Sequence, residues 1–393
     1  MEIRQVSADE RVDTMFPLQA YAFFASPWDD GDRESYRRRM VYYATATSLV
    51  AEADGAALAC VGGFPMRQNV RGRVLDMAGV ASVAAHPDAR RRGYVRALLE
   101  RLLRQMRDEG SVVSTLYPFR PSFYGRLGFV GLPHRRVATF EPQGLAHLLG
   151  ADLPGTVERL PMRDAFDAWD GLILRKLEEQ HGWAVFDAVR KAEFRTDAVW
   201  VAVARSGGEV VGAVAYRIDR YGGDLVAQDM LTTGPLGRHL LLQFFARHVD
   251  QVGRIVATVG LDDVPELWGT DFTVTTSGVV GFPRSPAPMA RVLDLEALAG
   301  LPVGEGAVTV EVVGDPLVRG TFRLAGEGGY LAVSQASAAA GATLGVPALS
   351  GLVYGVLDPV DVVARGLGRI ETGAAASLRT LFPRAMPYLF ADF

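Results

Sequence analysis

The sequence predicts an α/β (α+β) protein made of two similar sheet-and-helix units and a third α+β unit. Three observations lead to this prediction. A strand-like segment and a periodic helix follow one another at 75–106, the same order returns at 224–252, and a proline-rich stretch at 281–292 separates the second unit from the rest. At 393 residues the chain is also too long for one ordinary hydrophobic core.

The first unit is predicted over residues 1–150. Two strands at 48–64 flank a turn at Asp54-Gly55, and a third strand covers 75–85. The next segment carries apolar residues at helical spacing from Val95 to Met106, with charged residues on the opposite side. A strand at 111–118 follows, and then a short helical turn with a last strand at 123–130.

The second unit, predicted over residues 151–285, repeats this order. A helix-rich stretch at 164–182 precedes strands at 198–205 and 209–219, and the segment 224–252 combines a strand, a glycine turn and an apolar helix. The proline-rich stretch at 281–292 is interpreted as a linker. Strands at 307–326 and 330–334 and helices at 349–367 form the third unit, over residues 286–393.

Composition narrows the class of protein. The net charge of -4 and a pI of about 5.9 disfavour a general nucleic-acid binder. The single cysteine, Cys60, excludes an intramolecular disulfide and a cysteine-cluster metal site; a small buried hydrophobe is the favoured interpretation, with a catalytic thiol as the alternative. The charged N-terminal stretch has no apolar signal region, and no run of about 18 apolar residues occurs, so a cytoplasmic location is predicted.

Three consecutive arginines, Arg90, Arg91 and Arg92, stand before Gly93 at the start of the periodic helix. A helix N-terminus attracts anions through its free N–H groups and dipole, and glycine lets the backbone approach a ligand closely. The alternatives are a solvated helix start and a nucleic-acid patch, although three arginines on one loop form no extended basic stripe. The second unit has GPLGRHL at 234–240 in the corresponding place and lacks the arginine cluster.

The segment VAAHPDARRRGY at 83–94 resembles motif A of the GCN5-related N-acetyltransferases (GNAT), and FYGRLGF at 123–129 resembles the element that closes that fold. Val95 departs from the small residue of the family pattern, and His86 is expected to shape the turn. The resemblance implies acetyl-CoA as co-substrate and no metal. It places the pyrophosphate at Arg90, Arg91, Arg92, Gly93 and Tyr94, and the pantetheine arm and acetyl carbonyl at Ser82, Val83 and Ala84.

Over its full length the chain is similar to the enhanced intracellular survival (Eis) group of acetyltransferases, on RRRGYVRALL, FYGRLGF and the final ADF. This implies two tandem GNAT folds, the second degenerate, and a C-terminal domain like a sterol carrier protein. It also implies Tyr124 as general acid and the terminal carboxylate of Phe393 as base. A tyrosine with a pKa of about 10 can protonate a thiolate whose conjugate acid has a pKa of about 8.5. The alternatives are a packing role for Tyr124 and a frayed chain end.

The resemblance also implies a cationic polyamine as acceptor, such as an aminoglycoside or a lysine-like amine, and a homo-oligomer (hexamer). Binding to nucleic acid or to a membrane is not expected. Aromatic and acidic side chains attract such amines. The candidates are Phe23, Phe24, Trp28, Asp29, Met66 and Asp392. The competing hypothesis is a vestigial acetyltransferase that acts as a lipid- or partner-binding protein.

Overall fold

The computed structural model describes residues 2–24, 26–391 and 393, and it divides into two compact units. Unit 1 contains the chain up to Pro133, Gln180–Ala192 and Phe282–Phe393. Unit 2 contains His134–Glu179 and Glu193–Gly281. The chain thus enters unit 2 earlier than the predicted boundary at 150/151, and it returns to unit 1 for a short segment that the sequence analysis did not anticipate.

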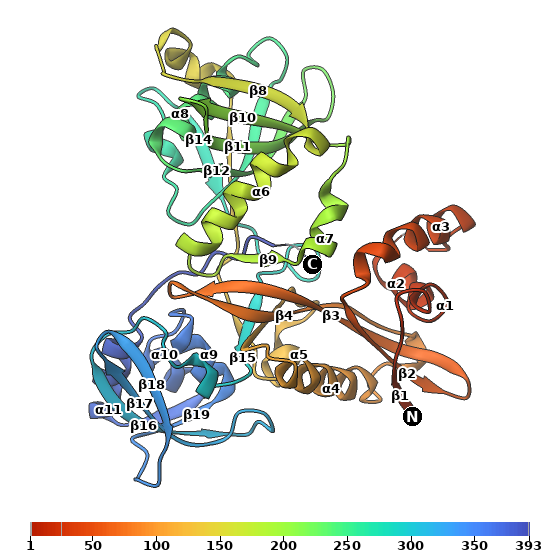
Figure 1. Cartoon of the computed structure of the whole chain (residues 1–393), viewed down its shortest axis with the longest axis vertical. Coiled ribbons are helices and arrows are strands. Elements are labelled where there is room, and N and C mark those ends of the chain that lie inside the picture. Colours follow the sequence, from red (N-terminus) through yellow and green to blue (C-terminus); the bar gives the residue numbers. More distant parts are fainter. Residues whose placement is uncertain (1, 25, 392) are drawn as a thin grey trace. The chain divides into compact units, whose positions relative to one another are not determined.

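Unit 1 is built on a mixed sheet in the order β1-β2-β3-β4-β5-β15-β6, with β9 paired to β3 (Figure 1). The predicted turn at Asp54-Gly55 is confirmed, since both residues have positive φ between β2 and β3. The strands are β1 (Glu2–Gln5), β2 (Thr47–Ala53), β3 (Ala56–Val70), β4 (Arg73–Ala85), β5 (Val113–Leu116), β6 (Val130–Gly131), β9 (Ala184–Phe186) and β15 (Met289–Val292).

Helices cover both faces of this sheet. The predicted periodic helix is confirmed as α4 (Tyr94–Asp108), whose apolar stripe packs against β2, β3 and β4. The N-terminal helix α2 lies on the opposite face of the sheet. Alternate residues of β3 point to opposite faces, so Val61 packs in the core under α4 and Cys60 packs in the core under α2. The other helices here are α1 (Arg11–Thr14), α2 (Phe16–Phe23), α3 (Asp30–Arg39), α5 (Pro121–Gly125) and α7 (Ala188–Lys191), with 3-10 turns at Met40–Tyr43 and Pro87–Ala89.

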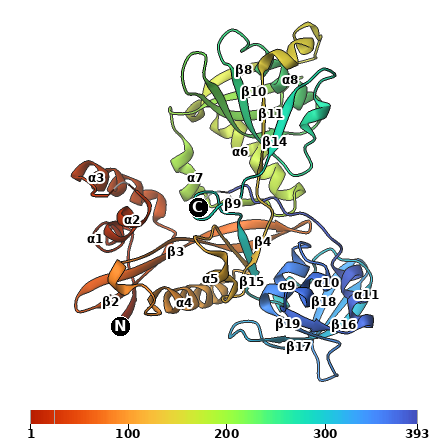
Figure 2. The same ribbon diagram turned by 180° about the vertical axis from the view of Figure 1, so that it is seen from behind.

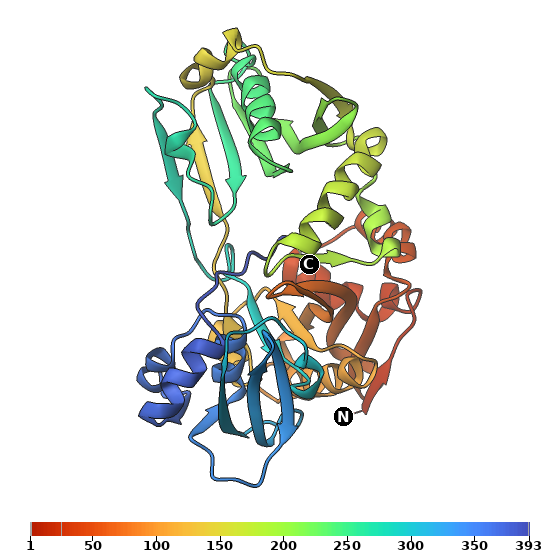
Figure 3. The same cartoon turned by 60° about the vertical axis from the view of Figure 1, so that its left-hand side comes forward.

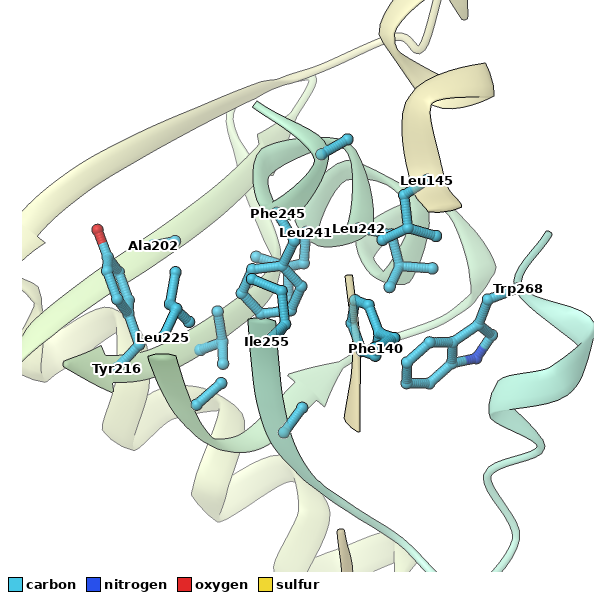
Figure 4. Packing of buried hydrophobic residues seen from close by; sticks show 14 of the residues in the cluster. Phe140, Leu145, Ala202, Tyr216, Leu225, Leu241, Leu242, Phe245, Ile255 and Trp268 are labelled. Atoms are coloured by element: carbon cyan, nitrogen blue, oxygen red, sulfur yellow. The ribbon is translucent and has the colours of Figure 1, made fainter. Parts of the chain in front are cut away.

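Unit 2 repeats this order of elements, as predicted, in a sheet ordered β14-β7-β13-β12-β11-β10-β8. Aromatic and aliphatic side chains such as Phe140, Phe245 and Ile255 pack in its core (Figure 4). Its elements are β7 (Arg136–Phe140), β8 (Thr156–Pro161), α6 (Met162–Glu179), β10 (Trp200–Ser206), β11 (Glu209–Ile218), β12 (Asp224–Thr232), α8 (Pro235–Ala246), β13 (Arg254–Val259) and β14 (Val274–Ser277), with 3-10 turns at Pro142–Gly150, Ala192–Phe194 and Pro265–Leu267.

The two sheets exchange one strand each. In unit 1 the strand between β5 and β6 is β15, which follows all of unit 2 in the chain. In unit 2 the strand between β13 and β14 is β7, which directly follows β6 of unit 1. The interpretation of 281–292 as a linker is therefore wrong for its last four residues, because backbone pairing with β5 and β6 makes them a strand.

The C-terminal part of unit 1 is an α+β domain with the sheet order β18-β17-β16-β19-β20. Its helices lie together on one side of that sheet (Figures 2 and 3). The elements are β16 (Gly306–Val313), β17 (Gly320–Glu327), β18 (Tyr330–Gln335), β19 (Ala342–Gly345), α9 (Val346–Val353), α10 (Pro359–Ala364), β20 (Gly368–Ile370) and α11 (Thr372–Leu381), with a 3-10 turn at Glu296–Leu298. A buried ion pair between Arg291 and Asp315, at 3.1 Å, ties β15 to this domain.

Among the described residues, no helix has the length and apolar composition needed to cross a membrane.

Candidate active site

Strand β4 runs past the end of its parallel neighbour β5. The pairing between them ends at Val80, while β4 continues to Ala85. On the other side, a β-bulge sets Ser82 and Val83 opposite Val61 of β3. Beyond Val80, β4 pairs with no described strand on the β5 side. Its backbone N–H and C=O groups are therefore open to an extended ligand, which can add to this edge as a further strand.

The arginine loop, residues 86–93, lies directly beyond this edge. Arg90, Arg91 and Arg92 are exposed, and none of them forms an ion pair with a described residue. Gly93 adopts the left-handed conformation at φ +85, and a Cβ at this position would meet no atom within 4 Å. The N–H groups of the first turn of α4 have no acceptor within the helix. Free amides, a helix dipole and three available guanidinium groups thus surround open space.

His86 has the role that the sequence predicts. Its Nδ1 accepts a hydrogen bond from the backbone N–H of Asp88 at 3.3 Å, at the start of the 3-10 turn Pro87–Ala89.

Ser82, the first residue of the bulge, has φ +57, a conformation that a residue with a side chain rarely adopts. The guanidinium of Arg11 donates hydrogen bonds to the hydroxyls of Ser48 and Ser82, the latter at 3.3 Å. Arg11 is only 1% exposed, and Tyr43 lies 4.6 Å from its guanidinium carbon, measured to the ring centroid. A side chain at Gly62 would press on Ser82, with its Cβ 3.3 Å from Ser82 Oγ. Arg11 and the absence of a side chain at Gly62 together fix the bulge.

Cys60 fits the buried-hydrophobe interpretation. The thiol is fully buried and donates to the carbonyl of Ser82 at 3.4 Å. Burial raises the pKa of the Cys60 thiol to about 12, so the thiolate that nucleophilic catalysis needs does not form at neutral pH.

Tyr124 lies on α5, within the core beneath α4. Its side chain is 2% exposed and contacts the rings of Phe119, Phe123 and Phe129 at centroid distances of 5.4, 5.1 and 6.1 Å. Burial raises the pKa of the phenol well above its ordinary value, so the group is protonated at neutral pH and has a proton to give. This state suits a general acid, and the same packing suits the alternative of a structural tyrosine.

The last residues of the sequence are docked on the sheet face opposite α4. Tyr117 Oη donates to the carbonyl of Ala391 at 3.0 Å, and Phe390 stacks on Trp183 at 4.1 Å. The ring of Phe393 packs edge-on against Tyr117 and Phe186, at 5.8 and 6.0 Å. A frayed end is thereby excluded for Phe393, and its ring lies 3.3 Å from the position that a Cβ on Gly79 of β4 would occupy.

The residues predicted to bind the acceptor separate into two groups. Met66 lies beside Phe393, since both side chains cover Gly79. Phe23, Phe24 and Trp28 are exposed near the ends of α2 and α3, and no ring contact joins them to Phe393 among the described residues. Asp29 accepts from the N–H of Asp32 at 2.8 Å in a capping box, so its carboxylate begins α3. The predicted Asp392 lies outside the described residues.

The sequence analysis missed the aromatic wall beside Phe393. Phe64 of β3 contacts Phe186 at 5.7 Å and Tyr43 at 5.3 Å, and the guanidinium of Arg190 lies over all three rings, 5.0 to 5.5 Å from their centroids. Phe186 and Arg190 belong to the segment that returns from unit 2, and Arg11 lies in a stretch that reads simply as charged. No local motif marks these residues. Phe186 and Arg190 reach β3 only because the returning segment carries them there.

Comparisons with known proteins agree with this geometry. Residues 2–131 match the sequence model of a family described as "Acetyltransferase (GNAT) domain". The "Uncharacterized N-acetyltransferase SCO2625" of Streptomyces coelicolor is 27% identical over 219 residues, which cover 50% of this chain and 52% of that protein. "N-acetyltransferase Eis" of Mycobacterium tuberculosis is 34% identical over 99 residues, 22% of this chain and 25% of that protein. The chain thus spans about half of the first relative and a quarter of the second.

Solved structures share the fold of the whole chain. A GCN5-related N-acetyltransferase from Kribbella flavida has a TM-score of 0.82 at 22% identity, covering 100% of this chain and 98% of that one. Eis1 from Mycobacterium abscessus has a TM-score of 0.77 at 17% identity, covering 100% of both chains. Residues 2–131 are therefore similar to a GNAT acetyltransferase domain, and the whole chain shares its fold with Eis1.

Proposed function

We propose that unit 1 transfers the acetyl group of acetyl-CoA to the primary amine of a small molecule. The observation that carries this proposal is the arginine loop, where three guanidinium groups without ion-pair partners among the described residues adjoin the open N-terminus of α4. Arg90, Arg91 and Arg92 would neutralise the pyrophosphate, while the amides from Gly93 and Tyr94 onward donate to its oxygens.

The free edge of β4 takes the pantetheine arm in this proposal. Backbone groups of Ser82, Val83 and Ala84 would pair with its amides, as a strand would. An N–H of the bulge would then point at the thioester oxygen, which gains negative charge during attack. Because Arg11 already holds the bulge, its backbone does not need to rearrange when the negative charge develops on the oxygen.

Two residues move protons in the proposed reaction. The carboxylate of Phe393 takes a proton from the acceptor ammonium, directly or through water, and leaves a neutral amine. The amine nitrogen forms a bond to the thioester carbon and gives its second proton to water, the carbon–sulfur bond breaks, and Tyr124 gives its proton to the departing thiolate. The Phe393 carboxyl then releases to solvent the proton that it took from the ammonium. Tyr124 recovers a proton from solvent before the next cycle.

For the acceptor we propose a cationic amine, such as an aminoglycoside or a lysine-like amine. The aromatic wall of Tyr43, Phe64 and Phe186 beside Phe393 supports this class, because ring faces attract cations and Arg190 already lies over all three rings. A hexameric assembly, a cytoplasmic location and a C-terminal domain like a sterol carrier protein stay predictions.

The decisive experiment changes the chain end. Adding one glycine after Phe393 moves the carboxylate away and should abolish acetylation of tobramycin and lysine while acetyl-CoA still binds, as isothermal titration would show. Phe393→Leu is the matched control, because it keeps the carboxylate and should retain most of kcat. Full activity of the extended chain would refute the base assignment.

Tyr124→Phe tests the acid. Proton transfer of this kind contributes about 10²-fold or more to the rate, so kcat should fall by that factor while the affinity for acetyl-CoA is kept. An unchanged kcat would make Tyr124 a packing residue. If the unaltered protein does not bind acetyl-CoA at micromolar concentrations, the vestigial lipid- or partner-binding alternative replaces the enzyme.

A further inference from the structure

Unit 2 contains a cavity that the proposed acetyl transfer does not use. Its volume is about 320 Å³, and its walls come from β8, β10, β11 and the segment after α8. The side chains that matter are Arg159, Trp200, Tyr216 and His248. The arginine loop of unit 1 adjoins the N-terminus of its helix, whereas this cavity lies beyond the C-terminal end of α8. It is therefore not a remnant of a donor site.

Strand register brings these side chains to one face. Trp200 of β10 pairs with Tyr216 of β11, and Ala202, two residues further along β10, pairs with Arg159 of β8. Residues that pair across strands share a face, as do residues two apart on one strand. This is the α8 face, because Ala202 and Tyr216 belong to the core that α8 covers. Figure 4 shows the hydroxyl of Tyr216 directed away from the labelled aliphatic cluster.

The cavity has a cationic wall without an acidic counterpart. The guanidinium carbon of Arg159 lies 4.6 Å from the centroid of the Trp200 ring. Arg159 forms no ion pair with a described residue, and the lining contains a second arginine, Arg217, and no Asp or Glu. A guanidinium over an indole ring can still donate hydrogen bonds from its edge, and a carboxylate accepts two of them in parallel.

Two polar groups near Arg159 complete the lining. Tyr216 is 2% exposed, and burial raises the pKa of its phenol to about 12, with Arg159 opposing the rise. The phenol is thus protonated and can donate. The Nδ1 of His248 lies 2.9 Å from the carbonyl of Phe244, and since a carbonyl only accepts, Nδ1 carries the proton. Burial lowers the pKa of His248, so the ring is neutral and Nε2 is an acceptor.

We propose that this cavity is a binding site for a small aromatic carboxylate that bears a hydroxyl or ring N–H group. Arg159 and Tyr216 bind the carboxylate, Trp200 stacks on the aromatic ring beside the guanidinium, and Nε2 of His248 accepts the hydroxyl or N–H proton. No covalent step is involved. The site is separate from the proposed acetyl transfer and does not depend on it.

The test is isothermal titration of the full chain with 4-hydroxyphenylacetate. Two matched ligands separate the contributions: 4-hydroxyphenylacetamide lacks the charge, and phenylacetate lacks the hydroxyl. We expect 4-hydroxyphenylacetate to bind, the amide to bind at least tenfold more weakly, and phenylacetate to bind severalfold more weakly. Equal affinity for the amide and the acid, or no binding of the acid, would overturn the proposal.

Variants locate the binding. Arg159→Gln and Trp200→Ala should each weaken binding of 4-hydroxyphenylacetate at least tenfold, while Arg220→Gln, an exposed arginine outside the cavity, should leave it unchanged. Thermal unfolding of each variant checks that unit 2 stays folded. Full binding by Arg159→Gln, displacement of the ligand by saturating acetyl-CoA, or equal binding of inorganic phosphate would each contradict an aromatic carboxylate site in this cavity.

Discussion

The parallel strand pairs β4–β5 in unit 1 and β12–β13 in unit 2 are built alike as far as the bulge. Pairing ends at Val80 in the first and at Ala227 in the second. Two residues beyond the end of this pairing, β4 carries a bulge opposite Val61 and β12 carries a bulge opposite Val214. The opening between two parallel strands is therefore a property of the repeated fold, and it does not by itself make a donor site.

The two units differ in the loop that follows. In unit 1 the loop holds Arg90, Arg91 and Arg92 and ends at Gly93, whose left-handed conformation exposes the first turn of α4. In unit 2, α8 begins directly after Gly234 with Pro235, which has no N–H to donate. The proposed anion binding thus depends on a few loop residues, and unit 2 lacks these residues while it keeps the sheet, the bulge and the helix.

Removing the charge from the arginine loop should have the largest effect on this comparison. In the double variant Arg91→Gln, Arg92→Gln, two charge-assisted hydrogen bonds to the pyrophosphate are lost, so KM for acetyl-CoA should rise about 10²-fold. Steady-state kinetics with varied acetyl-CoA measure this change. Arg238→Gln, at the corresponding helix of unit 2, is the control and should leave KM unaltered. An equal effect of the control would show that the arginines act only through overall charge.

The bulge of unit 1 offers a second test, because it contains Ser82, a non-glycine residue at positive φ. A left-handed residue with a side chain costs about 1–2 kcal/mol, and the hydrogen bond from Arg11 offsets part of this. Arg11→Met should therefore lower kcat about tenfold, since that energy corresponds to roughly a tenfold change.

Ser82→Gly tests whether Arg11 acts through the bulge, because glycine adopts the left-handed conformation without a stabilising hydrogen bond. The double variant Arg11→Met, Ser82→Gly should recover most of the lost kcat, while Ser82→Gly alone stays near the unaltered protein. If the double variant is as slow as Arg11→Met, then Arg11 does not act by holding the bulge. Thermal unfolding of each variant shows whether the change in kcat merely follows a change in overall stability.

The last comparison concerns the pH dependence of stability and involves no change in catalysis. His181 of unit 1 is neutral, since Nε2 donates to the carbonyl of Tyr354 at 3.0 Å and Nδ1 accepts from the N–H of Arg71 at 3.1 Å. Burial lowers its pKa to about 4, against about 6.5 in the unfolded chain. The unfolded state therefore binds the proton more readily, and the stability that His181 contributes is present above pH 6.5 and lost as pH falls towards 4, by up to roughly 3 kcal/mol.

His248 of unit 2 is the matched comparison, because burial lowers its pKa in the same direction. Unfolding midpoints measured between pH 4 and 7 should become less dependent on pH in His181→Asn than in His248→Asn. An unchanged pH dependence in His181→Asn would show that the histidine is not buried in its neutral form.

Local patterns were enough to predict much of unit 1. Apolar periodicity located α4, glycine located the turn between β2 and β3, and the arginine triplet before Gly93 indicated the donor site that we propose. These features depend on contacts between near neighbours in the chain, so they can be read from sequence. The repeat in unit 2 was visible for the same reason, because strand, glycine turn and helix follow one another there as well.

The strand exchange and the acceptor face could not be read in this way. Nothing in Met289–Val292 indicates that it pairs with β5, and nothing near Phe186 or Arg190 indicates that this segment meets β3. The predicted Phe23, Phe24 and Trp28 have the composition of a binding surface; they are exposed, and no ring contact joins them to Phe393 among the described residues.

The sequence by itself determined which elements form and where an anion can bind, because helix periodicity, turn residues and a charged helix start are local properties. Only the tertiary structure decided which distant segments share a sheet and which side chains meet at Phe393. Pairing between strands far apart in the chain is set by the backbone groups and apolar faces left unpaired after local structure has formed. Many segments could satisfy those groups and faces, and only the folded chain selects one.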